Sequence, residues 1–179
     1  MQPGSGKSTL CNKLSDNLGW KVNSIGGLFR ARYEEWKKDN KYISFEKYWA
    51  SVVTNKEIYE VNDEAREMLV KGGVILDSRY AAVNAFGLND CLLVFVKAPL
   101  AIRVKRNEHN LRYKGKSLDD IEELLSKREE NEVRRGRELY GHIFDGFDYR
   151  DERLYDLILD TSKLTVDEEV ASVLNYLKL

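Results

Sequence analysis

Cysteine, proline and histidine are scarce in this sequence of 179 residues, and long apolar runs do not occur. The two cysteines, Cys11 and Cys91, come with no recognisable signal peptide, which favours reduced thiols in a cytoplasmic protein. No apolar stretch approaches the roughly 20 residues that a membrane-spanning helix needs, so no membrane association is expected. Neither a repeat nor a Pro/Gly/Ser-rich linker divides the chain. We therefore expect one domain over residues 1–179.

An excess of charge of one sign is also missing. The 29 basic and 30 acidic residues nearly cancel, which argues against a protein that binds nucleic acid through bulk charge. The two histidines, His109 and His142, stand alone in polar stretches, where surface positions are expected rather than a metal site. Hydrophobic residues make up 42% of the chain, as in a soluble globular protein. The sequence does not define an oligomeric state.

Residues 2–9, QPGSGKST, hold the most informative motif. They match the phosphate-loop pattern G-x-x-x-x-G-K-[ST] at Gly6, Lys7 and Ser8. Glycine lets backbone N–H groups turn towards a phosphate chain, and the following helix adds its positive N-terminal end. We expect Lys7 to bind the β- and γ-phosphates of ATP and Ser8 to bind Mg²⁺. A Gly/Ser turn before a helix is the alternative. The residues predicted to bind ATP are Gly4, Ser5, Gly6, Lys7, Ser8 and Thr9.

One position of the motif departs from the pattern, because Met1 stands where the first glycine is required. The strand that normally leads into such a loop is not found either. Since that strand lies centrally in a parallel sheet, its loss would leave its neighbours about 10 Å apart with unpaired backbone between them. Either the start of the sequence is wrongly placed or shortened, which we favour, or another segment fills the position.

Apolar periodicity and turn residues predict helices that alternate with strands, hence an α/β fold with a parallel sheet. Ser44 and Ser117 are expected to cap helices at their N-termini, and Pro99 to begin one. An aromatic group is expected to form the core of a helical insert; a base pocket lined by one or two of its members is the less favoured alternative. Its members are Tyr33, Trp36, Phe45, Tyr48 and Trp49. The strands are expected near residues 20–22, 74–76, 92–96 and 157–159.

Polar residues that follow two turns are candidates for chemistry. Asp77 ends a buried strand, where an acid holds Mg²⁺ in phosphoryl-transfer folds; capping of the next turn is the alternative. Arg79 would face the crevice at the carboxyl ends of the strands and suits a second phosphate group, unless it is a surface arginine. Arg30 follows a Gly-Gly turn that lets backbone approach a ligand; a solvated position is its alternative.

The long helix expected after Ser117 carries arginines on its inward face. The stripe of Ile121, Leu124 and Leu125 continues at Arg128 and Arg135. A buried guanidinium needs a partner, and polyphosphate pairs with arginine bidentately, which predicts a lid that closes over the nucleotide. The alternative is pairing with a glutamate inside the helix, at position 132. The lid arginines so predicted are Arg103, Arg106, Arg128 and Arg135.

Six segments, in this order and spacing, resemble the cytidylate kinase-like family, in the short form of archaea and some bacteria. The similarity runs over essentially the whole chain, with few gaps. The segments are PGSGKST at 3–9, GGLFR at 26–30, VILDSR at 74–79, VKAPLAIRVKR at 96–106, KREENEVRR at 127–135 and LYDLILDTSKL at 154–164.

This resemblance implies a three-layer P-loop kinase with a parallel sheet, an acceptor-binding helical insert over about 30–72 and a helical lid over about 107–137. It implies transfer of phosphate from ATP, with Mg²⁺, to CMP or dCMP. The matched catalytic residues are Lys7, Arg103, Arg128 and Arg135. Arg103 and Arg106 join the loop in binding ATP. The residues matched to acceptor binding are Arg30, Arg79 and Asp77, and those matched to metal binding are Ser8 and Asp77.

Three departures from the family bear on the acceptor. Ser78 stands where glycine is usual, and Gly136 replaces a residue that is usually aromatic. The run VNDEAR at 61–66 matches poorly the helix in which the family offers an Asp and an Arg. The acceptor could therefore be another nucleotide or a small metabolite, or the protein could be a non-catalytic nucleotide-binding module. A GTPase is disfavoured, because the sequence has no N-K-x-D signature.

Overall fold

The computed structural model describes residues 2–40 and 43–178, apart from the side chain of Glu46. Met1, the departure from the loop motif, lies outside the described residues. The helices are α1 Lys7–Leu18, α2 Ile25–Asp39, α3 Phe45–Ser51, α4 Asn55–Lys71, α5 Ala81–Asn84, α6 Leu100–Asn107, α7 Leu118–Tyr140 and α8 Val166–Leu177. The strands are β1 Lys21–Ser24, β2 Val74–Asp77, β3 Val94–Lys97 and β4 Leu157–Asp160, and short 3₁₀ helices cover Leu111–Tyr113 and Glu152–Leu154. No helix in the described ranges is long and apolar enough to cross a bilayer.

The strands form two parallel pairs, which confirms a mixed α/β fold. β1 pairs with β2 so that Ser24 lies opposite Asp77, and β3 pairs with β4. Within the described residues no ladder joins β2 to β3, so the expected single sheet is present as two two-stranded sheets. Strands β1 and β3 start one and two residues later than expected. Before β3, the N–H of Leu93 donates to the Asp156 carboxylate, so a side chain takes the place of a ladder bond there.

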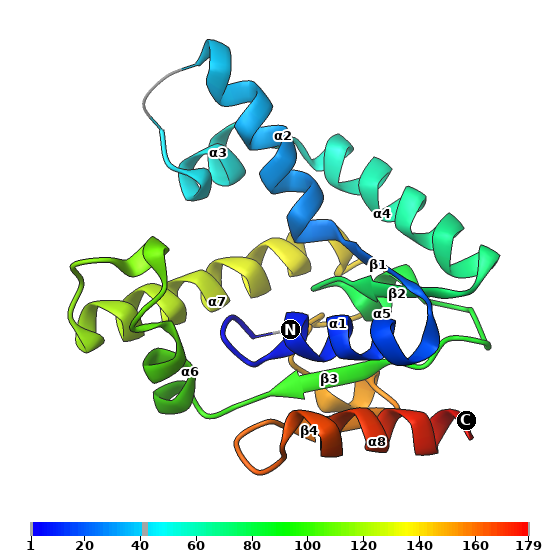
Figure 1. Ribbon diagram of the computed structural model, residues 1–179. Helices are drawn as coiled ribbons and strands as arrows, with labels where there is room; N and C mark the ends of the chain where they lie inside the picture. The colour runs from blue at the N-terminus through cyan, green and yellow to red at the C-terminus, as the bar shows by residue number, and fades with distance from the viewer. Residues whose placement is uncertain (1, 41–42, 179) are drawn as a thin grey trace.

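Helix α1 packs against both strand pairs (Figure 1). Its Leu10 and Leu14 share a core with Phe95 and Val96 of β3, and Ile75 of β2 packs against the same core. Helix α8 contributes to this core from the C-terminal end of the chain. The two sheets are therefore held in one body by a helix that starts directly after the glycine-rich loop, which fixes the position of that loop at the edge of both.

Helices α2, α3 and α4 form an arm on the far side of β1 and β2 (Figure 1). Tyr48 of the predicted aromatic group is buried in the core of this region, and the other four rings are partly buried and pack against that core. Ring centroids of neighbouring pairs within the group are 5.2–6.3 Å apart, and Trp49 contacts Phe29 instead, at 4.7 Å. Ser44 caps α3 as predicted, and Thr54 begins α4 with a capping box. The rings of the arm belong to a larger core that also includes Val133 and Leu139 of α7, so the arm is anchored to the rest of the fold.

Helix α7 runs between this arm and the glycine-rich loop (Figure 1). Ser117 caps it as expected, and Ile121 and Leu125 are fully buried, whereas Leu124 of the predicted stripe is 38% exposed. Gly136 has a steric role, because a Cβ there would lie 3.0 Å from the Phe147 ring and 3.1 Å from Tyr80. The unusual glycine therefore lets two aromatic rings pack directly on the helix.

Candidate functional site

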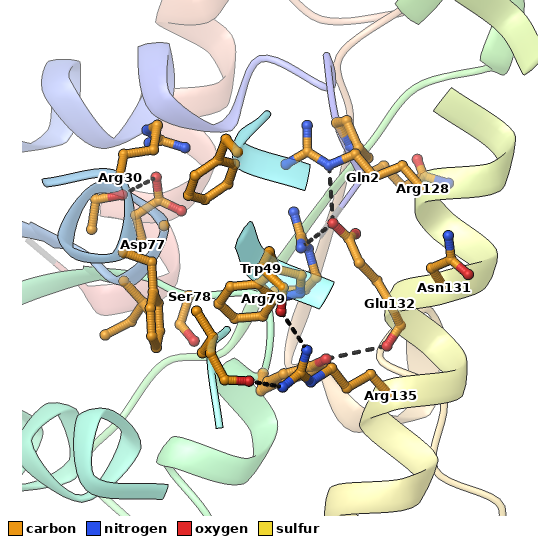
Figure 2. A pocket seen from close by; sticks show the side chains of 18 of the residues that line it. Gln2, Arg30, Trp49, Asp77, Ser78, Arg79, Arg128, Asn131, Glu132 and Arg135 are labelled. Atoms are coloured by element: carbon orange, nitrogen blue, oxygen red, sulfur yellow. Dashed lines mark hydrogen bonds and ion pairs between the residues drawn. The ribbon is translucent and has the colours of Figure 1, made fainter. Parts of the chain in front are cut away.

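A cavity of about 1170 Å³ lies between the glycine-rich loop, the end of β2, the helical arm and α7. This volume slightly exceeds the upper end of the usual range for small-molecule sites, about 300–1,000 Å³. Figure 2 shows Arg30 and Asp77 on one side and Arg79, Arg128 and Glu132 across from them. Charged side chains from three segments far apart in the sequence therefore converge on one space.

The glycine-rich loop, residues 2–6, forms one end of this cavity. Gly4 and Gly6 adopt φ of 79° and 90°, a conformation that favours glycine. A Cβ on Gly4 would lie only 2.4 Å from Nδ2 of Asn107, so the loop runs in close contact with α6. The Ser5 side chain is 1% exposed and its Oγ has no hydrogen-bond partner. With α1 starting at Lys7, the loop and the helix N-terminus present backbone N–H groups at one place.

Asp77 is the polar centre beside this loop. Its carboxylate forms an ion pair with Lys7 and lies 3.5 Å from Oγ of Ser8 and 3.4 Å from Oγ of Ser24. Asp77 is buried, and the parallel register places Ser24 beside it. One carboxylate with hydroxyl groups is the kind of oxygen set that holds Mg²⁺ together with substrate phosphates. Ser24 was not predicted from the sequence as a site residue. Its position at the end of the strand parallel to β2 could have indicated that it lies beside Asp77.

Two of the predicted lid arginines, Arg103 and Arg106, take part in a brace, a set of hydrogen bonds that holds the glycine-rich loop in place. Arg103 is 3% exposed, and it donates to the carbonyl oxygens of Ala98 at 3.0 Å and Pro3 at 3.3 Å. Its guanidinium also donates to Glu129 of α7 at 3.2 Å. Arg106 donates to Thr161 at 2.7 and 2.8 Å. In this conformation neither arginine lines the cavity.

Thr161, at the end of β4, completes this brace. Its hydroxyl donates to the carbonyl oxygen of Ser5 at 2.8 Å while it accepts from Arg106. Loop, α6 and the β4 end are therefore joined by hydrogen bonds that use loop carbonyls. These bonds engage loop carbonyl oxygens and not loop N–H groups, which a phosphate site needs as donors.

Arg79 and Arg128 meet at a shared carboxylate on α7. Both form ion pairs with Glu132, Arg79 through a terminal nitrogen and Arg128 through Nε at 3.0 Å. The alternative of pairing inside the helix therefore holds for Arg128. Burial lowers the pKa of Arg128, but the adjacent Glu132 outweighs it and the net shift is upward. From the sequence, position 132 was considered only as an alternative partner for the arginines of α7. Its ion pair with Arg79 was not predicted.

Arg135 takes a different position from the other two. Its guanidinium donates to the carbonyl oxygens of Trp49 and Val53, both at 2.7 Å, and lies 5.1 Å from the centre of the Trp49 ring. These contacts tie α7 to the end of α3. Trp49 lines the cavity beside Phe45, where an aromatic pair could stack on a flat ligand.

The pKa of Arg30 depends on its burial and on the charges that surround it in the cavity. Burial lowers this pKa most, and the positive charges of Arg112 and Arg128 lower it further, against the opposing effect of Asp77. The positive charges that lower the pKa of Arg30 give this part of the cavity a positive potential, which favours an anionic ligand. Arg112 and its neighbour Tyr113 line the cavity although no sequence signal singled them out.

Comparisons with known proteins identify a family. Residues 1–163 match the model of the cytidylate kinase-like family. A protein of Pyrobaculum aerophilum named cytidylate kinase is 35% identical over 176 residues, which cover 98% of this chain and 88% of the relative. Another of that name from Methanopyrus kandleri is 33% identical over 175 residues, 93% of this chain and 84% of the relative. A crystal structure of an uncharacterized protein from Eubacterium ventriosum superposes with a TM-score of 0.66 over 99% of this chain and 94% of its own, at 18% identity.

The solved structure, at that identity, supports the fold alone. The curated relatives and the family match go further, and they define the class of protein as a nucleoside monophosphate kinase. Within that class, the chain belongs to the cytidylate kinase-like family. The resemblance seen in the six sequence segments is thereby confirmed.

Proposed function

We propose that this protein is a cytoplasmic enzyme that phosphorylates CMP or dCMP to the diphosphate, using ATP and Mg²⁺. The observation that carries the proposal is one cavity with two anion-receptive ends, the glycine-rich loop at one and an arginine cluster at the other. A kinase of small nucleotides needs two such ends, because donor and acceptor phosphates must meet in line. The names of the relatives give the acceptor.

At the loop end, the backbone N–H groups of Gly4 to Ser8 and the Lys7 ammonium would hold the phosphates of ATP. Asp77 and Ser8 fit the oxygen donors that Mg²⁺ prefers. Bound Mg²⁺ would neutralise charge on the phosphates. Lys7 would then leave the Asp77 carboxylate and bind phosphate oxygens instead. The present ion pair with Asp77 holds the Lys7 ammonium close to that position.

At the arginine end, Arg30, Arg79 and Arg128 would hold the acceptor phosphate, and Trp49 would lie against the base. An acceptor phosphate oxygen would attack the γ-phosphorus of ATP, and the bond to the leaving ADP oxygen would break. The arginines spread charge and fix the approach, so no strong general base is needed.

This arrangement indicates which segments of the fold have which role. We assign residues about 30–72 to the acceptor-binding insert, about 107–137 to a lid, and the chain to the three-layer P-loop kinases. Closure of the lid would exclude water and bring Arg103 and Arg106 closer to the donor phosphates. The unpaired side of β2 and β3 suits a further strand between them. A chain extended at its amino end by an apolar segment that ends in glycine should then unfold at a higher temperature.

The test is a coupled assay for ADP release with CMP, dCMP, UMP, AMP and shikimate as acceptors. The proposal expects the highest kcat/KM with CMP or dCMP. Lys7→Ala should lower kcat by about 10³-fold, since it removes the cation that follows charge on the γ-phosphate. Preference for another acceptor would move the proposal to a different substrate. ATP binding without transfer to any acceptor would leave a nucleotide-binding module.

A further inference from the structure

Glu132 is an acidic side chain at the arginine end of the cavity. Its side chain is 7% exposed and lines the cavity together with Arg79 and Arg128, its two ion-pair partners. Figure 2 shows the carboxylate reaching from α7 towards both guanidinium groups. In this conformation the protein's own carboxylate occupies the groups that an acceptor phosphate would contact.

The hydrogen bonding of this cluster is incomplete. Oε2 of Glu132 and Nε of Arg79 are both buried, and neither has a hydrogen-bond partner. A buried charged group with unused hydrogen-bonding capacity costs free energy that a better partner recovers. A phosphate group offers three terminal oxygens and up to two charges, against two oxygens and one charge for a carboxylate. Phosphate therefore offers these two arginines more oxygen partners and more negative charge than Glu132 does.

The surroundings explain why a carboxylate is useful there at all. Arg30 lies in the field of Arg79, Arg112 and Arg128, which all lower its pKa. Asp77 opposes this effect at Arg30, but without a further internal anion the cations would still repel one another and would attract small anions of the solvent. A carboxylate at position 132 offsets that repulsion while the cavity has no phosphate in it.

We propose that Glu132 is an internal counter-anion that competes with the acceptor phosphate for Arg79 and Arg128, and so selects ligands by charge. A dianionic phosphate displaces the carboxylate, whereas a singly charged anion does not. Glu132 then acts as a specificity-determining residue that works through the two arginines. This inference rests on the proposed function only in taking this end of the cavity as a phosphate site.

The experiment is a calorimetric titration of inorganic phosphate into the wild-type chain and into Glu132→Gln. Competition predicts that Glu132→Gln binds phosphate about tenfold more tightly, because one opposing charge is removed at close range. If the carboxylate mainly holds the arginines in place, the same variant binds phosphate no more tightly or more weakly, and the proposal is wrong. Circular dichroism checks that both proteins are folded.

The matched control is Glu129→Gln. This glutamate lies three residues away on the same helix, is 8% exposed, and pairs with Arg103 outside the cavity. Its substitution should change phosphate affinity by less than about twofold. Because the glycine-rich loop is a second phosphate site, the gain must be located: adding Arg79→Ala to Glu132→Gln should cancel it. A gain that survives Arg79→Ala overturns the proposal.

A second measurement uses the wild-type chain alone. The carboxyl ¹³C resonance of Glu132, assigned by its loss in Glu132→Gln, should shift as phosphate is added and stay in place with the same concentration of acetate. No shift with phosphate, or an equal shift with acetate, contradicts selection by charge. Neither experiment needs turnover, so failure of the kinase assay and failure of this inference are distinguishable.

Discussion

The two ends of the cavity are held in different ways. At the loop end, the contacts use backbone carbonyls: Pro3 accepts from Arg103, and Ser5 accepts from Thr161. At the arginine end, side-chain charge holds the site, through the shared carboxylate of Glu132. The first end is fixed by the fold, whereas the partners at the second can be exchanged. Under the proposed function, a preorganised site for the donor phosphates and an adaptable site for the acceptor would thus be separated in space.

Because the two ends of the cavity are held differently, substitutions at each end should change different kinetic constants. Substitutions that disturb the loop should lower stability and affinity for ATP, because the loop shares contacts with α6 and β4. Substitutions at the arginine end should raise KM for the acceptor and leave KM for ATP nearly unchanged. Each variant below tests whether the two ends respond independently, and they run from the largest expected effect to the smallest.

Gly4→Ala should have the largest effect. A Cβ would lie 2.4 Å from Nδ2 of Asn107 and 3.2 Å from the Arg103 carbonyl oxygen, and φ of +79° is unfavourable for alanine. We expect kcat/KM for ATP to fall by about 100-fold or more and unfolding free energy by about 2–3 kcal/mol, from strain and crowding together. Steady-state kinetics and urea unfolding measure the two.

Gly19→Ala is the matched control for that variant. Gly19 ends α1 with φ of +67°, but a Cβ added there would have nothing within 4 Å. The substitution should cost about 1 kcal/mol through backbone strain alone and leave both KM values unchanged. Equal kinetic loss in the two variants would show that close packing against α6 does not hold the loop.

Arg79→Ala should act on the other end. Removing a cavity guanidinium should raise KM for the acceptor by about 100-fold, since a charged hydrogen bond to phosphate contributes about 1.5–3 kcal/mol. KM for ATP should stay within about threefold of wild type. Arg153→Ala, which removes an exposed arginine paired with Asp151, is the control. A parallel rise in both KM values for Arg79→Ala would contradict the separation of the two ends.

Arg103→Met tests the brace of the loop. The substitution leaves Glu129 buried without its partner, which should lower unfolding free energy by about 3 kcal/mol. KM for ATP should rise by about tenfold, because the Pro3 carbonyl loses its donor. Adding Glu129→Gln should restore part of the stability and none of the affinity for ATP. Recovery of both would mean that the ion pair, and not the loop contact, carries the effect.

Local patterns account for what the sequence alone could predict. Ser44 and Ser117 were recognised as caps, because capping depends on residues three positions apart, and Asp77 was recognised because it ends an apolar run. The parallel pairing of strands followed from the alternation of elements. The caps and the strand ends are determined within a few residues of chain, and the parallel pairing follows from the order of the elements, so the sequence is sufficient to predict them.

Contacts between distant segments could not be predicted in the same way. The bond from Arg103 to Pro3 spans 100 residues, and Arg79, just after β2, meets Glu132 on α7. Periodicity indicated that α7 would turn arginines inward, with phosphate or, alternatively, Glu132 as the expected partner of Arg135. Its partners are carbonyl groups at the end of α3, and every residue has such a group, so no sequence signal marks them.

Arg135→Lys should have the smallest effect and examines the joint between α7 and the arm. Arginine donates to both Trp49 and Val53 and lies against the Trp49 ring, whereas the compact ammonium of lysine can reach only one carbonyl at a time. We expect KM for the acceptor to rise by about three- to fivefold, since about 1 kcal/mol of one hydrogen bond is lost. KM for ATP should not change. Arg134→Lys, next to it and exposed, is the control. If Arg135→Lys instead lowers kcat by about 100-fold or more at saturating substrates, then Arg135 leaves these carbonyls and contacts the transferred phosphate in the closed state.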